Sequence, residues 1–277
     1  MRHGAVTADR EALRRLSGAC ALCLIGAIAL GNLLSGLLAR ALDAEAAQLL
    51  GAAAGLLVPF WLLARRFPAE RPVSRAARAP LWALLLLFLG AVGGGSLLSL
   101  GLRRALSLLG FGGRAITMPA GRASLLFSAV NTVLAAPILE EWAFRGVCFG
   151  ALRRFGDRFA LIASSALFAL LHVAPERWPL AFFSGLALAF CAQQTGNLRL
   201  SLALHIGYNA CGLALLLGGR ALPLLAHAAA VLPALPALSA ARPFFPDYEG
   251  PQPYRTFFLT PALLLVGVCI LFLGVTA

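Results

Sequence analysis

The chain has 277 residues, of which 60% are hydrophobic and only 12% are charged. A soluble globular domain carries about 25% charged residues, so this chain is too poor in charge to cover a surface in water. Collagen, intrinsic disorder and a disulfide scaffold are excluded as well, because the apolar fraction is high and six cysteines are few for this length. We therefore expect a protein whose solvent is largely lipid.

Basic residues outnumber acidic residues by 23 to 11, which gives a formal net charge of +12, and all of the basic residues are arginine. A basic excess is also typical of nucleic-acid binding, but that function needs a soluble basic surface or a recognised motif. Here the arginines lie between apolar runs, where they orient a chain in the bilayer and contact anionic headgroups. We expect membrane lipid, and not nucleic acid, as a partner.

Apolar runs recur along the whole chain, and a transmembrane helix needs about 20 such residues. The N-terminal part, 1–122, contains three runs separated by arginine-rich loops, at 19–39, 46–64 and 81–102. The central part, 123–217, contains one long helical pattern that ends at Phe155, followed by apolar segments at 159–173, 180–192 and 198–217.

The C-terminal part, 218–277, begins with an apolar segment at 221–240 that three prolines interrupt. Proline disrupts a helix interior, so this segment is interpreted either as re-entrant or as a span. A proline-rich polar loop then leads to a last apolar run at 257–275. The sequence predicts one all-α membrane domain, a multi-pass bundle of about eight transmembrane helices with a polar site buried in its core helices.

Ionisable residues inside the apolar segments mark the candidate site, because a charge in the middle of a membrane helix costs several kcal/mol. Glu141 and Arg145 are spaced i,i+4 on one helix face and can neutralise each other. Glu140 is turned about 100° away, which leaves its carboxylate free to accept a proton. The other ionisable residues inside the apolar segments are His172 and His205, and Asn209 is a polar companion.

Glu140 and His172 lie sixteen residues on either side of a predicted helix break at Gly156. Antiparallel helices joined there would place both residues about 24 Å from the turn, at 1.5 Å per residue. Phe168, one turn before His172, would pack beside it. A histidine in a membrane helix also serves simply as an interhelical hydrogen-bonding group, which is the structural alternative.

His205 and Asn209 share a helix face at i,i+4 spacing. Together they supply the hydrogen-bond donors that an anionic reaction intermediate needs. Contact between helices is again the alternative interpretation, since such side chains also hold membrane helices together.

Three motifs follow one another in the central part: Glu-Glu-x-x-x-Arg at 140–145, Phe-x-x-x-His at 168–172 and His-x-x-x-Asn at 205–209. In this order they resemble the CPBP family (CAAX prenyl protease and bacteriocin-processing, also called Abi), which includes the type II CAAX prenyl endopeptidases. The resemblance covers roughly 123–217. It implies a catalytic core there, an intramembrane endopeptidase of the cell membrane, and a peptide or protein substrate that is prenylated or carries a leader peptide.

The resemblance also implies roles for the polar residues. Glu140 would be the general base and His172 would help it to activate a water. His205 and Asn209 would stabilise the oxyanion, while Glu141, Arg145 and Phe168 would support the site. Glu140, His172 and His205 also make a two-histidine, one-carboxylate set for Zn²⁺, so a metalloprotease and a metal-free glutamate protease both stay open.

Two other classes of function use the same features. A non-catalytic immunity or binding protein would share the fold, and a transporter would use the ionisable residues as a proton relay. No inverted repeat or pair of broken helices supports the transporter, and the intact residue set favours catalysis. The positive-inside rule predicts a cytoplasmic N-terminus and a site nearer the outer face, whereas the resemblance implies a site that opens to the cytoplasm, so the side stays open.

Overall fold

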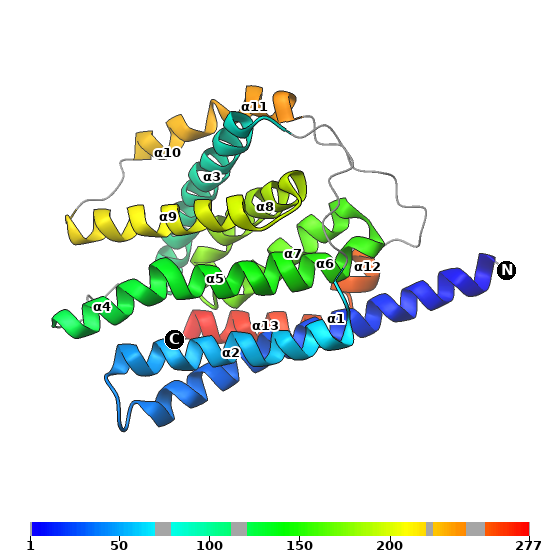
Figure 1. The fold of residues 1–277 in the computed structure, drawn as a ribbon, viewed down its shortest axis with the longest axis horizontal. Coiled ribbons are helices and arrows are strands. Elements are labelled where there is room, and N and C mark those ends of the chain that lie inside the picture. The colour runs from blue at the N-terminus through cyan, green and yellow to red at the C-terminus, as the bar shows by residue number, and fades with distance from the viewer. Residues whose placement is uncertain (1, 70–78, 112–120, 220–223, 242–252, 277) are drawn as a thin grey trace.

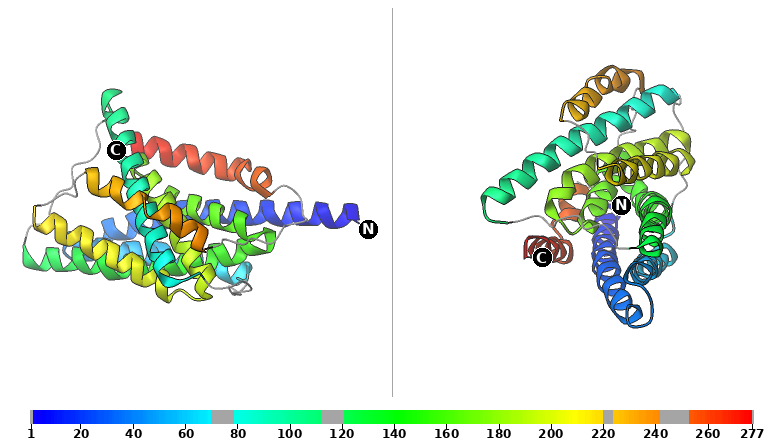
Figure 2. Two further views of the ribbon diagram at one scale, coloured as in Figure 1. Left: turned by 90° about the horizontal axis from the view of Figure 1, so that it is seen from above. Right: turned by 90° about the vertical axis from the view of Figure 1, so that its left-hand side faces the viewer.

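A computed structural model describes residues 2–69, 79–111, 121–219, 224–241 and 253–276 of the chain. Within these ranges the secondary structure is helical and contains no strand. Figures 1 and 2 show the helices in layers: α10 and α11 lie on α3, followed by α8 and α9, then the central helix, and then α1, α2 and α13 at the opposite side. The predicted all-α, multi-pass bundle is confirmed.

Six helices among the described residues are long and apolar enough to cross a membrane. Four of them are single elements, namely α1 (Arg2–Leu38), α2 (Ala44–Arg66), α3 (Leu81–Leu108) and α9 (Arg199–Leu217). The fifth is the continuous central helix Arg122–Phe155. The sixth is Leu224–Ala241, which consists of α10 (Leu224–Val231) and α11 (Ala234–Ala241).

The remaining helices are shorter: α7 (Asp157–Leu171), α8 (Trp178–Thr195), α12 (Pro253–Phe258) and α13 (Pro261–Thr276), with a 3₁₀ turn at Pro175–Arg177. With 15 residues, α7 is shorter than the roughly 20 that a span takes. Six spans are found among the described residues where about eight were expected, because apolar segments such as these form helices that do not qualify as spans. The proline-interrupted segment at 221–240 is two helices separated at Leu232 and Pro233 over its described part, while residues 221–223 lie outside the described ranges.

The central helix carries the candidate site and changes its winding along its length. It consists of α4 (Arg122–Val130), a π-helical segment (Asn131–Ala135), α5 (Ala136–Glu140), a second π-helical segment (Glu141–Cys148), α6 (Phe149–Leu152) and a 3₁₀ turn (Arg153–Phe155). Gly156 then adopts φ 106°, a left-handed conformation that glycine tolerates, and α7 begins after it. The long helix and the break at Gly156 are therefore confirmed.

Aromatic residues hold the central helix in the middle of the bundle. Phe144 is fully buried, and its ring centroid lies 5.2 Å from that of Phe60 on α2 and 5.2 Å from that of Phe168 on α7. Such tilted and edge-on pairs contribute beyond simple burial. Because Phe144 lies within one turn of Glu141, these ring contacts fix the central helix beside the polar residues.

Candidate active site

The polar residues singled out in the sequence lie on three neighbouring helices. Glu140 is the last residue of α5, and Glu141 begins the π-helical segment after it. His205 and Asn209 lie on α9, which packs along the central helix. His172 follows directly after α7. The site is thus built where α7 and α9 meet the middle of the central helix.

Glu141 and Arg145 form the predicted i,i+4 ion pair, with 3.0 Å between Glu141 Oε1 and Arg145 Nη1, and both side chains are 1% exposed. His205 Nδ1 lies 2.9 Å from the same carboxylate oxygen. A buried carboxylate is costly unless it is paired and hydrogen-bonded. Arg145 and His205 therefore hold Glu141 in the apolar core between them.

Glu140 has different surroundings from its neighbour in the sequence. Its side chain is 14% exposed, and its Oε2 lies 3.6 Å from His205 Nε2. His205 therefore lies between two carboxylates. Its Nδ1 is within hydrogen-bond distance of Glu141, whereas its Nε2 is just beyond that distance from Glu140. The same imidazole thus faces both glutamates, one buried and paired with Arg145 and the other partly exposed.

Phe168 lies at the centre of the other contacts. Its ring centroid is 4.9 Å from that of His172 and 6.0 Å from that of His205, and Arg145 Cζ lies 4.3 Å from the same centroid. A guanidinium over a buried aromatic face is a favourable cation–π contact. The predicted packing of Phe168 beside His172 is confirmed, and the same ring also orients Arg145.

His172 caps the C-terminal end of α7, with φ −80° and ψ 43°, and its Nδ1 lies 3.0 Å from the carbonyl oxygen of Phe168. In this stretch, which the structure describes throughout, no hydrogen bond or ion pair joins His172 to Glu140. The equal-depth estimate assumed a uniform rise of 1.5 Å per residue. The π-helical segment, the 3₁₀ turn and the end of α7 at Leu171 all depart from that assumption.

Asn209 is held by an irregularity in the central helix. Its Nδ2 donates to the carbonyl oxygen of Thr132, at 2.8 Å. In the first π-helical segment the N–H of Ala136 bonds the carbonyl oxygen of Asn131, five residues earlier. The next bond of this pattern would join Thr132 to Pro137, and proline has no N–H to donate. The carbonyl of Thr132 is therefore available to Asn209, which ties α9 to the central helix.

Residues 122–211 match the family model described as type II CAAX prenyl endopeptidase Rce1-like. This segment is similar to that family. It contains all three motifs and makes up about a third of the chain. The match confirms the family resemblance and supports, at family level, a CAAX-type intramembrane protease that acts on a peptide or protein. No curated protein and no solved structure matches the chain significantly.

Two features of the matched segment were not predicted from the sequence. The first is the pair of π-helical segments around Glu140, and such segments occur often at functional sites. Pro137 was the available signal for the first of them. The second is the close approach of α8: Arg145 Nη2 donates to the carbonyl oxygen of Gly185 at 3.4 Å, and a Cβ on Gly185 would lie 3.2 Å from the ring of Phe168.

A zinc ion would require Glu140, His172 and His205 around one point. Among the described residues, no group of three His, Cys, Asp or Glu side chains is arranged to hold a metal ion. The two nitrogens of His205 face Glu141 and Glu140, and the Nδ1 of His172 faces the carbonyl oxygen of Phe168. In this arrangement the three side chains do not converge on one point as a zinc ion requires.

Proposed function

We propose that the chain is an intramembrane endopeptidase of the cell membrane in which Glu140 is the general base. The observation that supports this most is the contrast between two adjacent glutamates. Glu141 is 1% exposed and is neutralised by Arg145 and His205, whereas Glu140 is more exposed and has no arginine partner among the described residues. Two carboxylates with different surroundings take different roles in catalysis.

In the proposed reaction, Glu140 takes a proton from a water as that water attacks the scissile carbonyl carbon. His172 orients the water: with Nδ1–H directed at the carbonyl of Phe168, its Nε2 is an acceptor for the second water hydrogen. The carbonyl π electrons move to the oxygen. When the tetrahedral intermediate collapses, the C–N bond breaks and Glu140 returns its proton to the leaving amine.

The oxyanion needs donors that are in place before the reaction. His205 is oriented for this role because Glu141 holds its Nδ1, which directs Nε2 toward Glu140, where the water would be activated. In this proposal the imidazole carries a proton on both nitrogens during the reaction and donates Nε2–H to the oxyanion. Asn209 uses one amide hydrogen on Thr132 and keeps a second for the intermediate. In this scheme, which is of the glutamate type, Glu141 and Arg145 position His205 and do not touch the substrate.

We propose a prenylated peptide end or a leader peptide as the substrate, and the family match supports the first of these two. Two alternative functions are compatible with the same fold: a non-catalytic immunity or binding protein, and a transporter. They differ from the protease in one measurable respect, because neither cuts a peptide bond.

Comparison of the peptides in membranes and medium of cells that carry the wild type or Glu140→Gln tests the proposal. Glu45→Gln, which changes a glutamate at the start of α2, is the matched control. We expect specific fragments with the wild type and the control, and their uncut precursors with Glu140→Gln and His172→Ala. The same fragments in all four samples would rule out Glu140 as the base. No fragments in any sample would favour a non-catalytic protein.

A further inference from the structure

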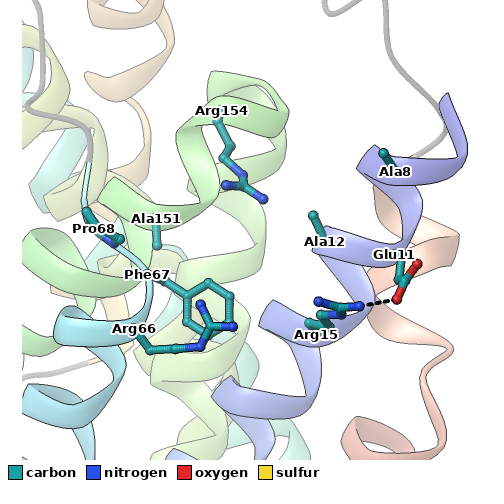
Figure 3. Close-up of a pocket in the computed structure, with 9 residues that line it drawn as sticks. All are labelled: Ala8, Glu11, Ala12, Arg15, Arg66, Phe67, Pro68, Ala151 and Arg154. Carbon is teal, nitrogen blue, oxygen red and sulfur yellow. Dashed lines mark hydrogen bonds and ion pairs between the residues drawn. The ribbon is translucent and has the colours of Figure 1, made fainter. Parts of the chain in front are cut away.

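A cavity of about 360 Å³ lies at the C-terminal end of the central helix, where Ala151 and Arg154 line it (Figure 3). One wall comes from the N-terminal turns of α1, a second from the end of α2 and the residues after it, and a third from the end of the central helix. Arg154 in this wall lies 14 residues after Glu140, which corresponds to roughly 20 Å along the helix. The cavity is therefore separate from the candidate active site.

Positive charge dominates this cavity. Arg15, Arg66 and Arg154 line it, and Glu11 is the one acidic residue among its lining side chains. Figure 3 shows the three guanidinium groups around the same space, each from a different wall, with Glu11 paired to Arg15. The local charge is thus positive by two even after Glu11 is counted.

Two of these arginines are held by aromatic rings and by no carboxylate among the described residues. Arg66 Cζ lies 5.4 Å from the ring centroid of Phe67, and Arg154 Cζ lies 4.6 Å from that of Phe155. Stacking on an aromatic face leaves the N–H edge of a guanidinium available. The cavity therefore offers oriented donors in a fork geometry, the form that suits a phosphate group.

The position of the cavity along the helices places it at the headgroup level of the bilayer. Arg66 is the last residue of the apolar helix α2, and Arg15 lies four residues before the apolar run that starts at 19. On α2, Arg65 lies over the half-exposed ring of Trp61, with 4.7 Å to its centroid. Tryptophan and arginine at a helix end are typical of the membrane–water interface.

We propose that this cavity binds the phosphate of an anionic phospholipid. The three arginines would contact the phosphate oxygens, and the acyl chains would stay in the bilayer beside α1 and α2. Free phosphate presents the same oxygen atoms, but a lipid can also pack its acyl chains against the apolar surfaces of α1 and α2 next to the cavity. Exposed apolar side chains on these two helices include Leu22 and Leu62.

The test is a titration of the purified full-length protein in neutral detergent with phosphatidylglycerol, with bound lipid counted by native mass spectrometry. Arg66→Gln and Arg154→Gln remove one contact each, and Arg104→Gln on the exposed surface of α3 is the matched control. We expect each cavity variant to weaken binding about fivefold, which corresponds to about 1 kcal/mol per basic residue. Arg104→Gln should bind like the wild type.

Parallel titrations separate the possible ligands. Phosphatidylcholine should bind far more weakly than phosphatidylglycerol, and inorganic phosphate or glycerol 3-phosphate at the same concentration should not displace the lipid. Equal binding of both lipids, an equal loss in Arg104→Gln, or unchanged binding in both cavity variants would each overturn the proposal. Displacement of the lipid by inorganic phosphate would show a site for free anions, which also overturns it.

Discussion

Replacement of Arg145 by methionine should destabilise the whole bundle. The change keeps an unbranched side chain, although a shorter one, and removes the charge that neutralises Glu141, whose side chain is 1% exposed. It also removes the cation–π contact on Phe168 and the hydrogen bond to the carbonyl of Gly185. A carboxylate without its arginine is then left in the core, where His205 still contacts it.

The expected magnitude follows from the burial of the pair. Removal of one partner of a buried ion pair costs roughly 3–5 kcal/mol, because the other charge loses its compensation. For a chain of this size that corresponds to a decrease in the unfolding midpoint of about 6–20 °C. The exposed pair Glu11–Arg15 provides the contrast, since each side chain is 64% exposed and such a pair contributes about 0–1 kcal/mol.

Thermal unfolding in detergent, followed with a thiol-reactive dye, measures the effect. Four of the six cysteines are buried, so the dye labels them only when the bundle opens. The two exposed ones, Cys211 and Cys269, are changed to serine in every sample. Arg15→Gln is the surface control, and the double variant Glu141→Gln, Arg145→Met removes both charges.

We expect the unfolding midpoint to fall strongly in Arg145→Met and to change little in Arg15→Gln. The midpoint of the double variant should lie closer to that of the wild type. The double variant should recover because no unpaired charge then stays buried. If Arg145→Met unfolds at the wild-type temperature, the pair does not hold the core. If the double variant is less stable than Arg145→Met, the reasoning from unpaired charge is wrong.

Four further outcomes are expected. Pro137→Ala supplies an N–H that competes with the amide of the α9 asparagine for the carbonyl of Thr132, so kcat should fall more than KM changes in a peptide assay. Gly95→Ala should lower the unfolding midpoint because its Cβ would lie 2.9 Å from the backbone of α8. Gly101→Ala has open space around it and should raise the free energy of unfolding by up to about 1 kcal/mol. Ser17→Ala removes a buried hydrogen bond between α1 and α12, at 2.8 Å, and should cost about 1–3 kcal/mol in the same unfolding assay. Peptide cleavage should survive treatment with a chelator, and elemental analysis of the purified protein should find zinc far below one ion per chain; loss of activity that zinc restores would contradict the glutamate scheme.

Much of the fold could be predicted because lipid imposes simple rules on a chain. Apolar runs of sufficient length and the glycine at position 156 located the long helices and the break after the central helix. The i,i+4 pairing of Glu141 with Arg145 was also predictable, because it depends only on local helix geometry.

Contacts between distant segments were harder to predict. The hydrogen bond between Glu141 and His205 joins residues 64 positions apart, and it depends on how α9 is rotated against the central helix. The relation between Glu140 and His172 depends on the rise of the helix between them, which the π-helical segment alters. The spacing of the motif residues in the sequence does not determine how α9 is rotated or how far the central helix rises per residue.

The central claim is that Glu140 removes a proton from water in a peptidase. It is tested most directly with purified protein in liposomes and a library of farnesylated and unmodified peptides, with cleavage products identified by mass spectrometry. We expect the wild type to cut a defined bond in some of these peptides, and Glu140→Gln to lose the activity by at least about a thousandfold while its unfolding midpoint is unchanged. Cleavage of the same bonds at the wild-type rate by folded Glu140→Gln would contradict the claim.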